Sequence, residues 1–509
     1  MGYMLSSDIE KITYASPITA TADTKIPRGD ITTLLDLANR DLLENDLFPI
    51  NTGTTWFARD VERRLLPFTP HIQEIPHRGP AAFGQRFSFD IGSQIVGDMM
   101  FGAVLQVRLG HWLDQQTQNL LAANKYSYDA SGTAWEYANS LGTALIQRAE
   151  LEIDGKTVET IDGDFANVFS LLFQDFNGQY GVAYDHLGRL SIPRMLHLQQ
   201  PRLFPTEQGV VHCILPFFFM RTKYKDALPL TSIREGLVRI NVTLRPFSEC
   251  VRQLRGYRDT CESVPLNTDF VFDSVLTTPS SSVTVKSFEA APDFQSVKLL
   301  TYGAIVDGVL RQKLLRAPHE IIHREVQTFY FDEPLKYAVG IKNQADTIRV
   351  QLPLEANHPL EEIIWFIRRK GAAENNAWTN YTGVLERGWN ARKAQVPLLR
   401  SAAVQANGVI LCEAEEQYFR QLIAQHHHGG LAAYNSFVYG YPFARFPGEH
   451  QPSGTLNASR LNSLRLILDI RPPIASNPEE DTAWEVKVFC IGLNWMRFDN
   501  GIANPMFES

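Results

Sequence analysis

Apolar and polar residues alternate with a period of two along several segments of this chain. The clearest segments cover residues 148–153, 238–245, 347–354, 464–470 and 484–490. This pattern predicts antiparallel strands that bury one face and expose the other. Strand patterns do not alternate regularly with helical ones, which argues against a doubly wound α/β enzyme.

The segment 148–161 predicts a β-hairpin. Alternating residues lie on both sides of Asp154-Gly155. A type I′ turn needs positive φ at both central positions, and this dipeptide adopts such a turn readily.

Helical patterns are few. We predict one helix over 413–425, with Tyr418 and Phe419 on its buried side, and another over 165–173. The connections 110–143 and 370–400 show little periodicity. Many short strands with long loops are typical of β-sandwiches and jelly rolls, so the predicted class is all-β with a few short helices in loops.

The length of 509 residues allows two large β domains. A polar stretch with Thr277-Thr278-Pro279-Ser280 lies within the candidate boundary region, 265–296. We therefore predict an N-terminal arm over 1–40, a first domain over 41–265 and a second domain over 266–509. We find no sequence repeat between the two domains.

Charge narrows the classes of function. The chain has 48 Lys and Arg against 56 Asp and Glu, a formal net charge of -8. A protein that coats nucleic acid neutralises phosphates with basic residues, so direct binding of nucleic acid is not expected.

The cysteines and the N-terminal sequence indicate the cellular compartment in which the chain is expected to fold. The five cysteines include no CxxC pair, so neither a zinc site nor a disulfide framework is indicated, and we expect free thiols in a reducing compartment. The first 24 residues lack the pattern of a secretory signal. The longest apolar run, 210–220, is too short for a membrane-spanning helix.

Candidate chemistry is sparse. His426-His427-His428 could hold a metal, but adjacent histidines seldom reach one ion together, and a loop-facing run is the simpler interpretation. His319 and His323 stand four apart, at what we interpret as a junction between a loop and a strand. The glutamate pairs are better explained as solvated charges than as facing glycosidase carboxylates. We therefore predict no catalytic residue, no metal and no cofactor.

Three tripeptides match the glycosylation pattern, at Asn241, Asn380 and Asn457. Tripeptides this short arise by chance, and Asn241 falls in a predicted strand. Without a secretory signal the usual route to glycosylation is closed to them.

Several stretches in a fixed order carry a further signal. They are 55–59 (TWFAR), 145–155 (LIQRAELEIDG), 215–219 (LPFFF) with 227–230 (ALPL), 325–327 (EVQ), 357–365 (NHPLEEIIW) and 449–461 (EHQPSGTLNASRL). Together they resemble the major capsid protein of nucleocytoplasmic large DNA viruses, the group that includes iridoviruses and phycodnaviruses. The resemblance is collinear over residues 45–500, and the last stretch is its most specific part.

The resemblance implies a double jelly roll, that is, two consecutive eight-stranded jelly rolls. It also implies a homotrimer with a pseudo-hexagonal outline that tiles an icosahedral shell around an internal membrane. The implied partners are neighbouring capsomers and minor capsid and penton proteins, with assembly in the host cytoplasm. The acidic charge agrees with a wall that lipid separates from the genome.

The two most specific stretches supply the candidate site residues, for which we expect structural roles. We interpret His450, Asn457 and Arg460 as fixing a loop or a trimer contact, or else as flanking a simple turn around Pro452-Ser453-Gly454. The full set is His358, Pro359, Trp365, His450, Gln451, Pro452, Ser453, Gly454, Asn457 and Arg460.

Two other classes stay open. A β-sandwich that binds or cleaves carbohydrate would need an aromatic platform or two facing carboxylates. A minor capsid or vertex protein could use the same double jelly roll in fewer copies.

Overall fold

A computed structural model describes residues 68–506. It leaves out 111–126, 129–132, 174–186, 188–208, 222–225, 235, 256–261, 265–272, 278–281, 287–292, 334–346, 384–395, 424–436 and 472–482. The described residues belong to one compact unit, Pro67–Ser509. The predicted arm over 1–40, the stretch 55–59 and His426-His427-His428 lie outside the described residues.

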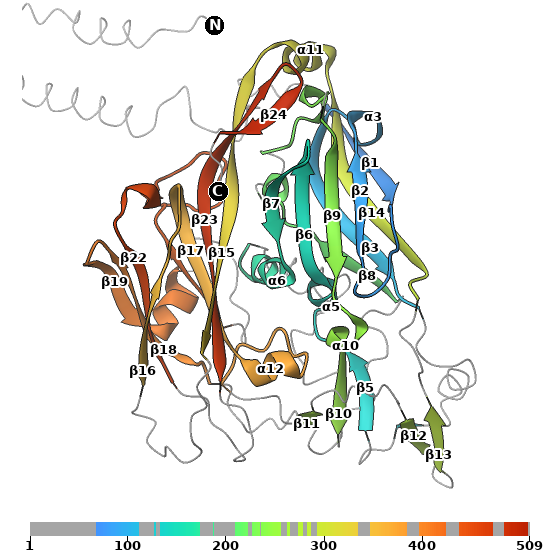
Figure 1. Ribbon diagram of the computed structural model, residues 1–509, viewed down its shortest axis with the longest axis vertical. Helices are drawn as coiled ribbons and strands as arrows, with labels where there is room; N and C mark the ends of the chain where they lie inside the picture. The colour runs from blue at the N-terminus through green and yellow to red at the C-terminus, as the bar shows by residue number, and fades with distance from the viewer. Residues whose placement is uncertain are drawn as a thin grey trace, which may run out of the picture. The chain divides into compact units, whose positions relative to one another are not determined.

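The first half of this unit is built on two four-stranded antiparallel sheets (Figure 1). One sheet has the order β1 (Phe68–Pro76), β14 (Ser296–Val306), β3 (Met99–Arg108), β8 (Val210–Ile214). The other has the order β2 (Arg86–Ile91), β9 (Val238–Leu244), β6 (Ile146–Ile153), β7 (Lys156–Ile161). Two small sheets extend from its loops: β4 (Ser127–Tyr128) with β12 (Asp273–Thr277) and β13 (Ser282–Lys286), and β5 (Thr133–Tyr137) with β10 (Val251–Arg255) and β11 (Glu262–Val264).

The second half repeats this arrangement. One sheet has the order β15 (His319–Glu333), β23 (Trp484–Asp499), β17 (Pro359–Arg369), β20 (Val438–Pro442), with β21 (Leu456–Asn457) beside β17 and β24 (Ile502–Pro505) beside β23. The other has the order β16 (Ile348–Pro353), β22 (Leu464–Ile470), β18 (Leu399–Ala406), β19 (Val409–Glu415).

The two halves have the same topology. When the eight main strands of each half are counted along the chain, both halves pair them in the orders 1-8-3-6 and 2-7-4-5. Each half is therefore an eight-stranded jelly roll, and the predicted all-β double jelly roll is confirmed. We call β1 to β14 the first jelly roll and β15 to β24 the second.

Strand pairing places the last strand of the first jelly roll later than the sequence suggested. β14 pairs with both β1 and β3, across residues 296–306. A division at 265/266 would separate this strand from its sheet. We therefore propose a division within 307–318, where α11 (Gly308–Arg316) connects the two jelly rolls.

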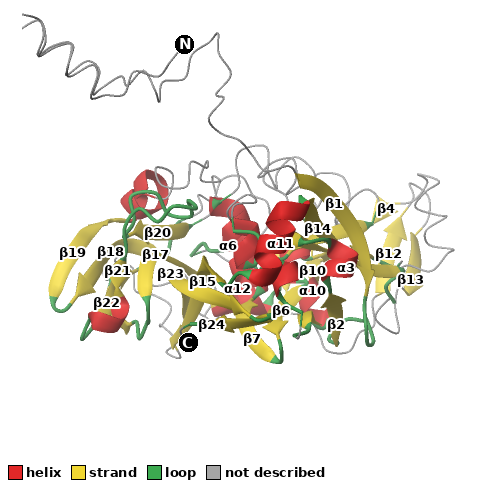
Figure 2. Cartoon of the chain, turned by 90° about the horizontal axis from the view of Figure 1, so that it is seen from above, coloured by secondary structure: helices red, strands yellow, loops and turns green. Residues whose placement is uncertain are grey.

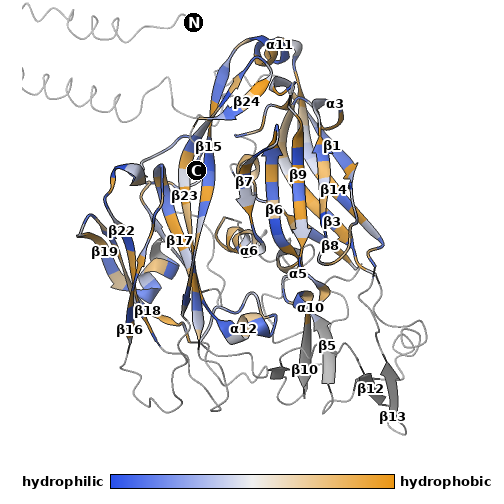
Figure 3. Cartoon of the chain, in the orientation of Figure 1, coloured by the Kyte–Doolittle hydropathy of each residue, from blue (hydrophilic) through white to orange (hydrophobic). Residues whose placement is uncertain are grey.

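Alternation explains most of the strands. All five alternating segments form strands, and β23 continues to Asp499. The same alternation is visible in Figure 3 as mixed orange and blue along the main strands of the two jelly rolls. The predicted hairpin is confirmed as β6 and β7, with φ of 53° at Asp154 and 75° at Gly155.

Helices are short and lie in the loops. Besides α11, the described residues form α3 (Ser93–Val96), α5 (Leu141–Ala144), α6 (Gly163–Leu172), α9 (Phe218–Arg221), α10 (Phe247–Cys250), α12 (Lys370–Glu374), the short 3-10 helices η2 (Leu230–Ser232) and η4 (Ala458–Arg460), and the π-helix η3 (Tyr418–Ile423). Among the described residues, no helix is long and apolar enough to cross a bilayer.

The helix predicted over 165–173 is confirmed, and the helix predicted over 413–425 is confirmed for residues 416–423. Helix α6 covers most of 165–173 and is almost fully buried. Residues 413–415 of the second segment are the end of strand β19, and the helical residues 416–423 include the π-helix η3. Phe419 is buried as predicted, whereas Tyr418 is 40% exposed. The hairpin at Asn407-Gly408, with φ of 48° and 83°, commits the residues that follow it to pairing with β18.

Candidate functional site: the buried junction between the jelly rolls

The two jelly rolls meet along a junction formed by loops of the first and a sheet of the second. Strand β7 and helix α9 contact β15, while α6 packs on β23 through Phe165 and Phe489, whose ring centres are 5.2 Å apart. Figure 2 shows α6 and α12 between the strands of the two jelly rolls. The junction is crossed by buried ion pairs, which form two clusters.

Arg324 lies at the centre of the first cluster. Its guanidinium donates to both oxygens of Glu361, at 2.6 Å from Nε and 3.0 Å from Nη2. It also donates to Asp226 at 3.2 Å and to the carbonyl of Glu449. The carboxylate of Asp226 lies 2.6 Å from Nδ1 of His450. Asp226 belongs to the first jelly roll and the other four residues to the second, so this arginine ties the two together.

A second buried pair supports Arg324 from the side of the first jelly roll. Arg221 pairs with Glu159 and donates to the carbonyl of Arg324 at 3.1 Å. Glu159 also accepts from the backbone N–H of Phe218 at 2.8 Å. Burial raises the pKa of Glu159, while Arg221 opposes this shift. The loss of either partner would leave an uncompensated charge in the interior.

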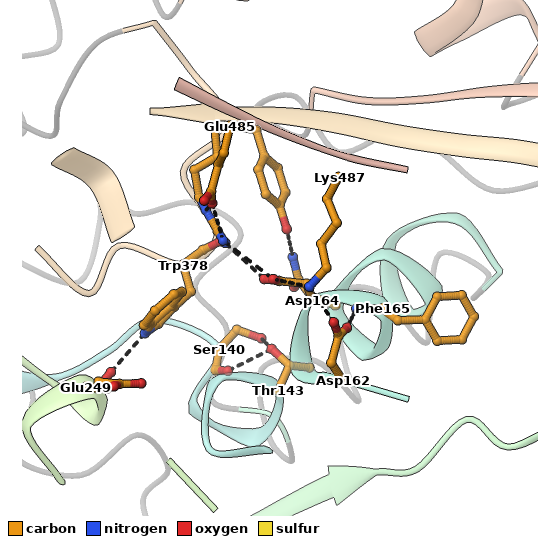
Figure 4. Close-up of polar contacts among 12 residues, drawn as sticks. Ser140, Thr143, Asp162, Asp164, Phe165, Glu249, Trp378, Glu485 and Lys487 are labelled. Atoms are coloured by element: carbon orange, nitrogen blue, oxygen red, sulfur yellow. Dashed lines mark hydrogen bonds and ion pairs between the residues drawn. The ribbon is translucent and has the colours of Figure 1, made fainter. Parts of the chain in front are cut away.

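The second cluster surrounds the start of α6 (Figure 4). Arg368 donates to Asp164 at 2.9 Å and to Glu485 at 2.6 Å. Lys487 donates to Asp164 at 2.9 Å and also to Asp162, the residue that caps the helix. Burial alone would raise the pKa of Asp164, but Arg368 and Lys487 together hold it well below its ordinary value.

The loop after α12 completes the junction. The indole of Trp378 donates to the carbonyl of Glu249 at 2.8 Å, a contact drawn in Figure 4. The guanidinium of Arg245 lies 3.8 Å from the centre of the Trp378 ring, a close cation–π contact. Asn376 donates to the carbonyl of Val251 at 2.7 Å. This part of the predicted loop 370–400 therefore binds the first jelly roll.

The two most specific sequence stretches lie side by side. β21 pairs with β17 in the register Pro359 with Asn457. The backbone N–H of His358 donates to Ser459 Oγ at 2.9 Å. The imidazole of His358 lies 2.5 Å from a carboxylate oxygen of Glu325. The stretches thus position Glu361 and the Glu449 carbonyl around Arg324.

Of the remaining predicted residues, Trp365 lies in the core of the second jelly roll, and Ser453 and Gly454 lie in the turn that precedes β21. Trp365 is fully buried, and its ring stacks on Tyr439 with centres 5.9 Å apart. Ser453 Oγ accepts from the N–H of Phe446 at 2.8 Å, and Gly454 has a φ of 142°, so both shape the turn. Three further members of the set are exposed or half-buried: Gln451, Pro452 and Arg460.

The histidine pair is placed differently from the sequence interpretation. His319 and His323 both lie in β15, where the pair was expected to straddle a loop and a strand. His319 stacks on Phe498, with ring centres 5.0 Å apart. His323 is buried, and burial lowers its pKa to about 4, so it is neutral at pH 7. The described residues contain no group of three or more metal-ligating side chains.

The burial of the asparagine side chains decides whether the three glycosylation tripeptides are accessible for modification. Asn241 is buried in β9 and donates to Glu152 at 2.8 Å. Asn380 is buried and accepts from Thr382 Oγ1 at 2.7 Å. Neither amide is offered by the folded chain, which argues against modification there. Asn457 is half-buried in β21.

A cleft of about 480 Å³ borders the junction. It is lined by Gln147, Arg148, Thr160, Ile161, Asp162, Thr243 and Thr328. None of these side chains is aromatic, so the cleft lacks the platform that a carbohydrate site was expected to need. The paired glutamate Glu361 is held by Arg324 and is fully buried, which excludes it from acid–base work on a bound sugar.

Two family models match most of the chain. The model for the N-terminus of the major capsid protein matches residues 55–286. The model described as large eukaryotic DNA virus major capsid protein matches residues 311–504. The chain belongs to this family of major capsid proteins. Its members are structural proteins without enzymatic activity, and the resemblance inferred from the sequence is confirmed.

Relatives among known capsid proteins are distant. The major capsid protein of Phaeocystis pouchetii virus is 22% identical, over 91% of this chain and 97% of the relative. That of Chrysochromulina ericina virus is 23% identical over 64% of this chain. The match spans only 55% of the length of the Chrysochromulina ericina virus protein, and 41% for the relative from Trichoplusia ni ascovirus 2c.

Solved structures share the fold. The structure of PBCV-1 VP54 fitted into a reconstruction of the virophage Sputnik aligns with a TM-score of 0.64 at 18% identity, over 89% of this chain and all of that one. The Faustovirus major capsid protein aligns with a TM-score of 0.61 at 12% identity, over 93% and 98% of the two chains.

Sequence reasoning missed the charged residues that make the junction. No motif marks the four residues that form the main ion pairs, which are Arg324, Asp226, Arg368 and Asp164. Each of them, taken alone, would be interpreted as a charged residue on the surface. The one available signal was their position within or beside strongly apolar segments, where an unpaired charge would be costly.

Proposed function

We propose that this chain trimerises into a pseudo-hexagonal capsomer, and that capsomers tile an icosahedral shell around an internal membrane. The observation that carries the proposal is the repeated topology of the two jelly rolls. Three chains with two equivalent jelly rolls each supply six similar units around one axis. Head-to-tail association of such units closes into a ring when the rotation from one unit to the next divides the circle.

The junction contributes rigidity to this function. Buried, bidentate ion pairs hold a fixed geometry better than solvated contacts, because every donor has one matching acceptor. We propose that Glu361, the Glu449 carbonyl and His450 act as positioning residues for the angle between the jelly rolls. A fixed angle is what a ring of six units needs in order to close.

The proposed partners follow from the proposed place of the chain in an icosahedral shell. A formal net charge of -8 supports a wall that contacts protein neighbours and does not bind the genome directly. Neighbouring capsomers, minor capsid and penton proteins and a nearby membrane are the proposed surroundings in the virion, with assembly in the host cytoplasm. Weak contacts between capsomers suffice, because multivalency in a closed shell multiplies them.

The test is the solution mass and shape of the purified chain. Light scattering after gel filtration should give about 172 kDa for three chains of 57.5 kDa. Electron microscopy should show particles with a hexagonal outline. A folded monomer of 57.5 kDa would overturn the proposal, and a low copy number in virions would favour a vertex protein.

A further inference from the structure

His323 lies at the boundary between the two jelly rolls. It belongs to β15 of the second jelly roll and is 2% exposed. Its ring packs on Phe218 of α9, in the first jelly roll, with ring centres 5.0 Å apart. Its Nδ1 is buried and has no hydrogen-bond partner within the part of the chain that the structure describes. This suits a neutral imidazole, because a protonated ring has two N–H groups that both need acceptors.

A buried guanidinium from α9 acts on the same ring. Arg221 lies three residues after Phe218, and its positive charge opposes protonation of His323. Arg221 also donates to the backbone carbonyl of Arg324 at 3.1 Å, so a hydrogen bond joins the two jelly rolls one residue away from His323. A proton on His323 would therefore add a positive charge beside an arginine that holds the junction together.

The carboxylates around the ring already serve other partners. The charged or titratable groups that act on His323 are Glu325 of its own strand, Arg221 of α9, Asp226 of the loop after α9 and His358 of the turn before β17, while Glu159 of β7 and Glu362 of β17 act on Arg221. Glu325 contacts the imidazole of His358 at 2.5 Å and accepts from Asn494, the residue opposite His323 in β23, at 2.8 Å. Asp226 accepts from Arg324 at 3.2 Å. Neither carboxylate can take on a protonated His323 without weakening a contact that it makes now.

We propose that His323 is an acid-sensitive switch: as a neutral ring it packs on Phe218 and holds α9 on β15, and as a protonated ring it separates them while each jelly roll stays folded. The closed junction leaves the charged ring desolvated, whereas water in the open junction solvates it. The switch itself goes beyond the proposed function. Its consequence rests on that function: loss of the fixed angle between the jelly rolls would open the capsomer, so acid would favour disassembly.

The size of the acid response follows from the two protonation equilibria. Burial is the main cause that lowers the pKa of His323 to about 4 in the closed junction, against about 6.5 for a solvated histidine in the open one. The open form therefore binds the proton more tightly, and its equilibrium constant with the closed form should rise about 20-fold between pH 7 and pH 5. His450 acts in the opposite direction, because its protonation strengthens its contact with Asp226, but its side chain is exposed and this effect is smaller.

Hydroxyl-radical footprinting of the full chain, with peptides analysed by mass spectrometry, measures opening of the junction. Phe218 is 1% exposed, so its oxidation should be slow at pH 7 and should rise by up to about 20-fold at pH 5. Phe89, which is fully buried in the core of the first jelly roll, should stay protected at both pH values. A joint rise in the oxidation of Phe89 and Phe218 would mean that the first jelly roll unfolds, and would overturn the switch.

Variants that cannot take up a proton at position 323 test whether this histidine is responsible. His323→Phe keeps an aromatic ring against Phe218, and His323→Gln carries the test if the larger ring prevents folding. Either variant should show the same rate of Phe218 oxidation at pH 7 and pH 5. His71→Gln is the matched control, because His71 is a half-buried histidine in β1, on the side of the first jelly roll away from β15, and should keep the full rise (Figure 1). An undiminished rise in the His323 variants, or no rise in the unmodified chain, would overturn the proposal.

Gel filtration with light scattering of the same samples tests the consequence for assembly. The unmodified chain should be a trimer of about 172 kDa (3 × 57.5) at pH 7 and should lose it at pH 5, whereas His323→Phe should stay trimeric at both. A trimer that persists at pH 5 although Phe218 becomes accessible would overturn the link between the switch and disassembly. A monomer at pH 7 would refute the proposed function instead, and the oxidation of Phe218 would still decide whether the switch exists.

Discussion

Removal of Arg324 should cost several kcal/mol at neutral pH and much less in mild acid. The variant Arg324→Met keeps most of the side-chain volume but deletes the charge. Glu361 is fully buried, and among the described ion pairs its cationic partner is Arg324. The substitution therefore leaves a buried carboxylate without that partner. Asp226 is less affected, because His450 still contacts it from the surface.

The size of the stability loss can be calculated from the free energy of protonating Glu361 once its partner is removed. Its cheapest response is to take up a proton. For a carboxyl of ordinary pKa, about 4.3, protonation at pH 7 costs about 1.36 × 2.7, or roughly 3.7 kcal/mol. At pH 5 the same step costs about 1 kcal/mol. We therefore expect a loss of about 4 kcal/mol at pH 7, in the range for a broken buried ion pair.

Denaturant unfolding followed by tryptophan fluorescence measures this loss. The protein concentration must be fixed, because assembly stabilises the folded state by mass action. The double variant Arg324→Met with Glu361→Gln should recover most of the stability and lose the pH dependence, since an amide does not ionise. Arg86→Met is the control, because Arg86 and Glu150 form a pair in which the arginine is 59% exposed and is worth less than about 1 kcal/mol.

Two outcomes would refute this reasoning. One is a stability loss below about 1 kcal/mol at pH 7, which would mean that water or another cation readily compensates the charge of Glu361. The other is an equal cost at pH 5 and pH 7. That result would assign the loss to packing, because packing does not depend on the protonation of a carboxyl.

Three further predictions concern single residues. His323 has a folded pKa of about 4 against about 6.5 unfolded, so the unfolded chain takes up a proton first as the pH falls between these values, and about 3 kcal/mol of stability is lost in that window. His323→Phe should remove this loss, which unfolding at pH 7 and pH 4.5 measures; an unchanged pH dependence would contradict it. Gly155→Ala should cost about 1 kcal/mol through its φ of 75° alone, since no atom lies within 4 Å of an added Cβ, and a thermal melt without any shift would count against this. Asp162→Ala should cost about 1–2 kcal/mol by removing the cap on the N–H of Phe165, whereas Asp162→Asn should keep the cap and most of the stability; equal losses would place the effect in the Lys487 pair instead.

Local patterns predicted the elements whose signals are local. Period-two alternation identified β9, β16, β22 and β23 because apolar and polar residues alternate along the predicted segments, although the structure buries both faces of most of β23. Asp154-Gly155 identified the β6–β7 turn because positive φ at two successive positions is a property of those two residues themselves. These inferences needed no partner elsewhere in the chain.

Pairing over long distances decided two features that local patterns could not. Pairing with β18 makes residues 413–415 the end of a strand, whereas residues 416–423 of the predicted helix 413–425 are helical. The boundary at 265/266 followed a polar stretch, but β14 completes a sheet with β1 and β3, which begin about 200 residues earlier.

The sequence by itself determined the class of fold, the family and the positions of its specific motifs. Only the tertiary structure decided what those motifs do. Arg324 meets Glu361 across 37 residues and Asp226 across 98, and Arg368 meets Asp164 across 204. A charged residue looks the same in sequence whether water or another charge neutralises it. The choice between these depends on which strands the two jelly rolls bring together, and that is a property of the folded chain alone.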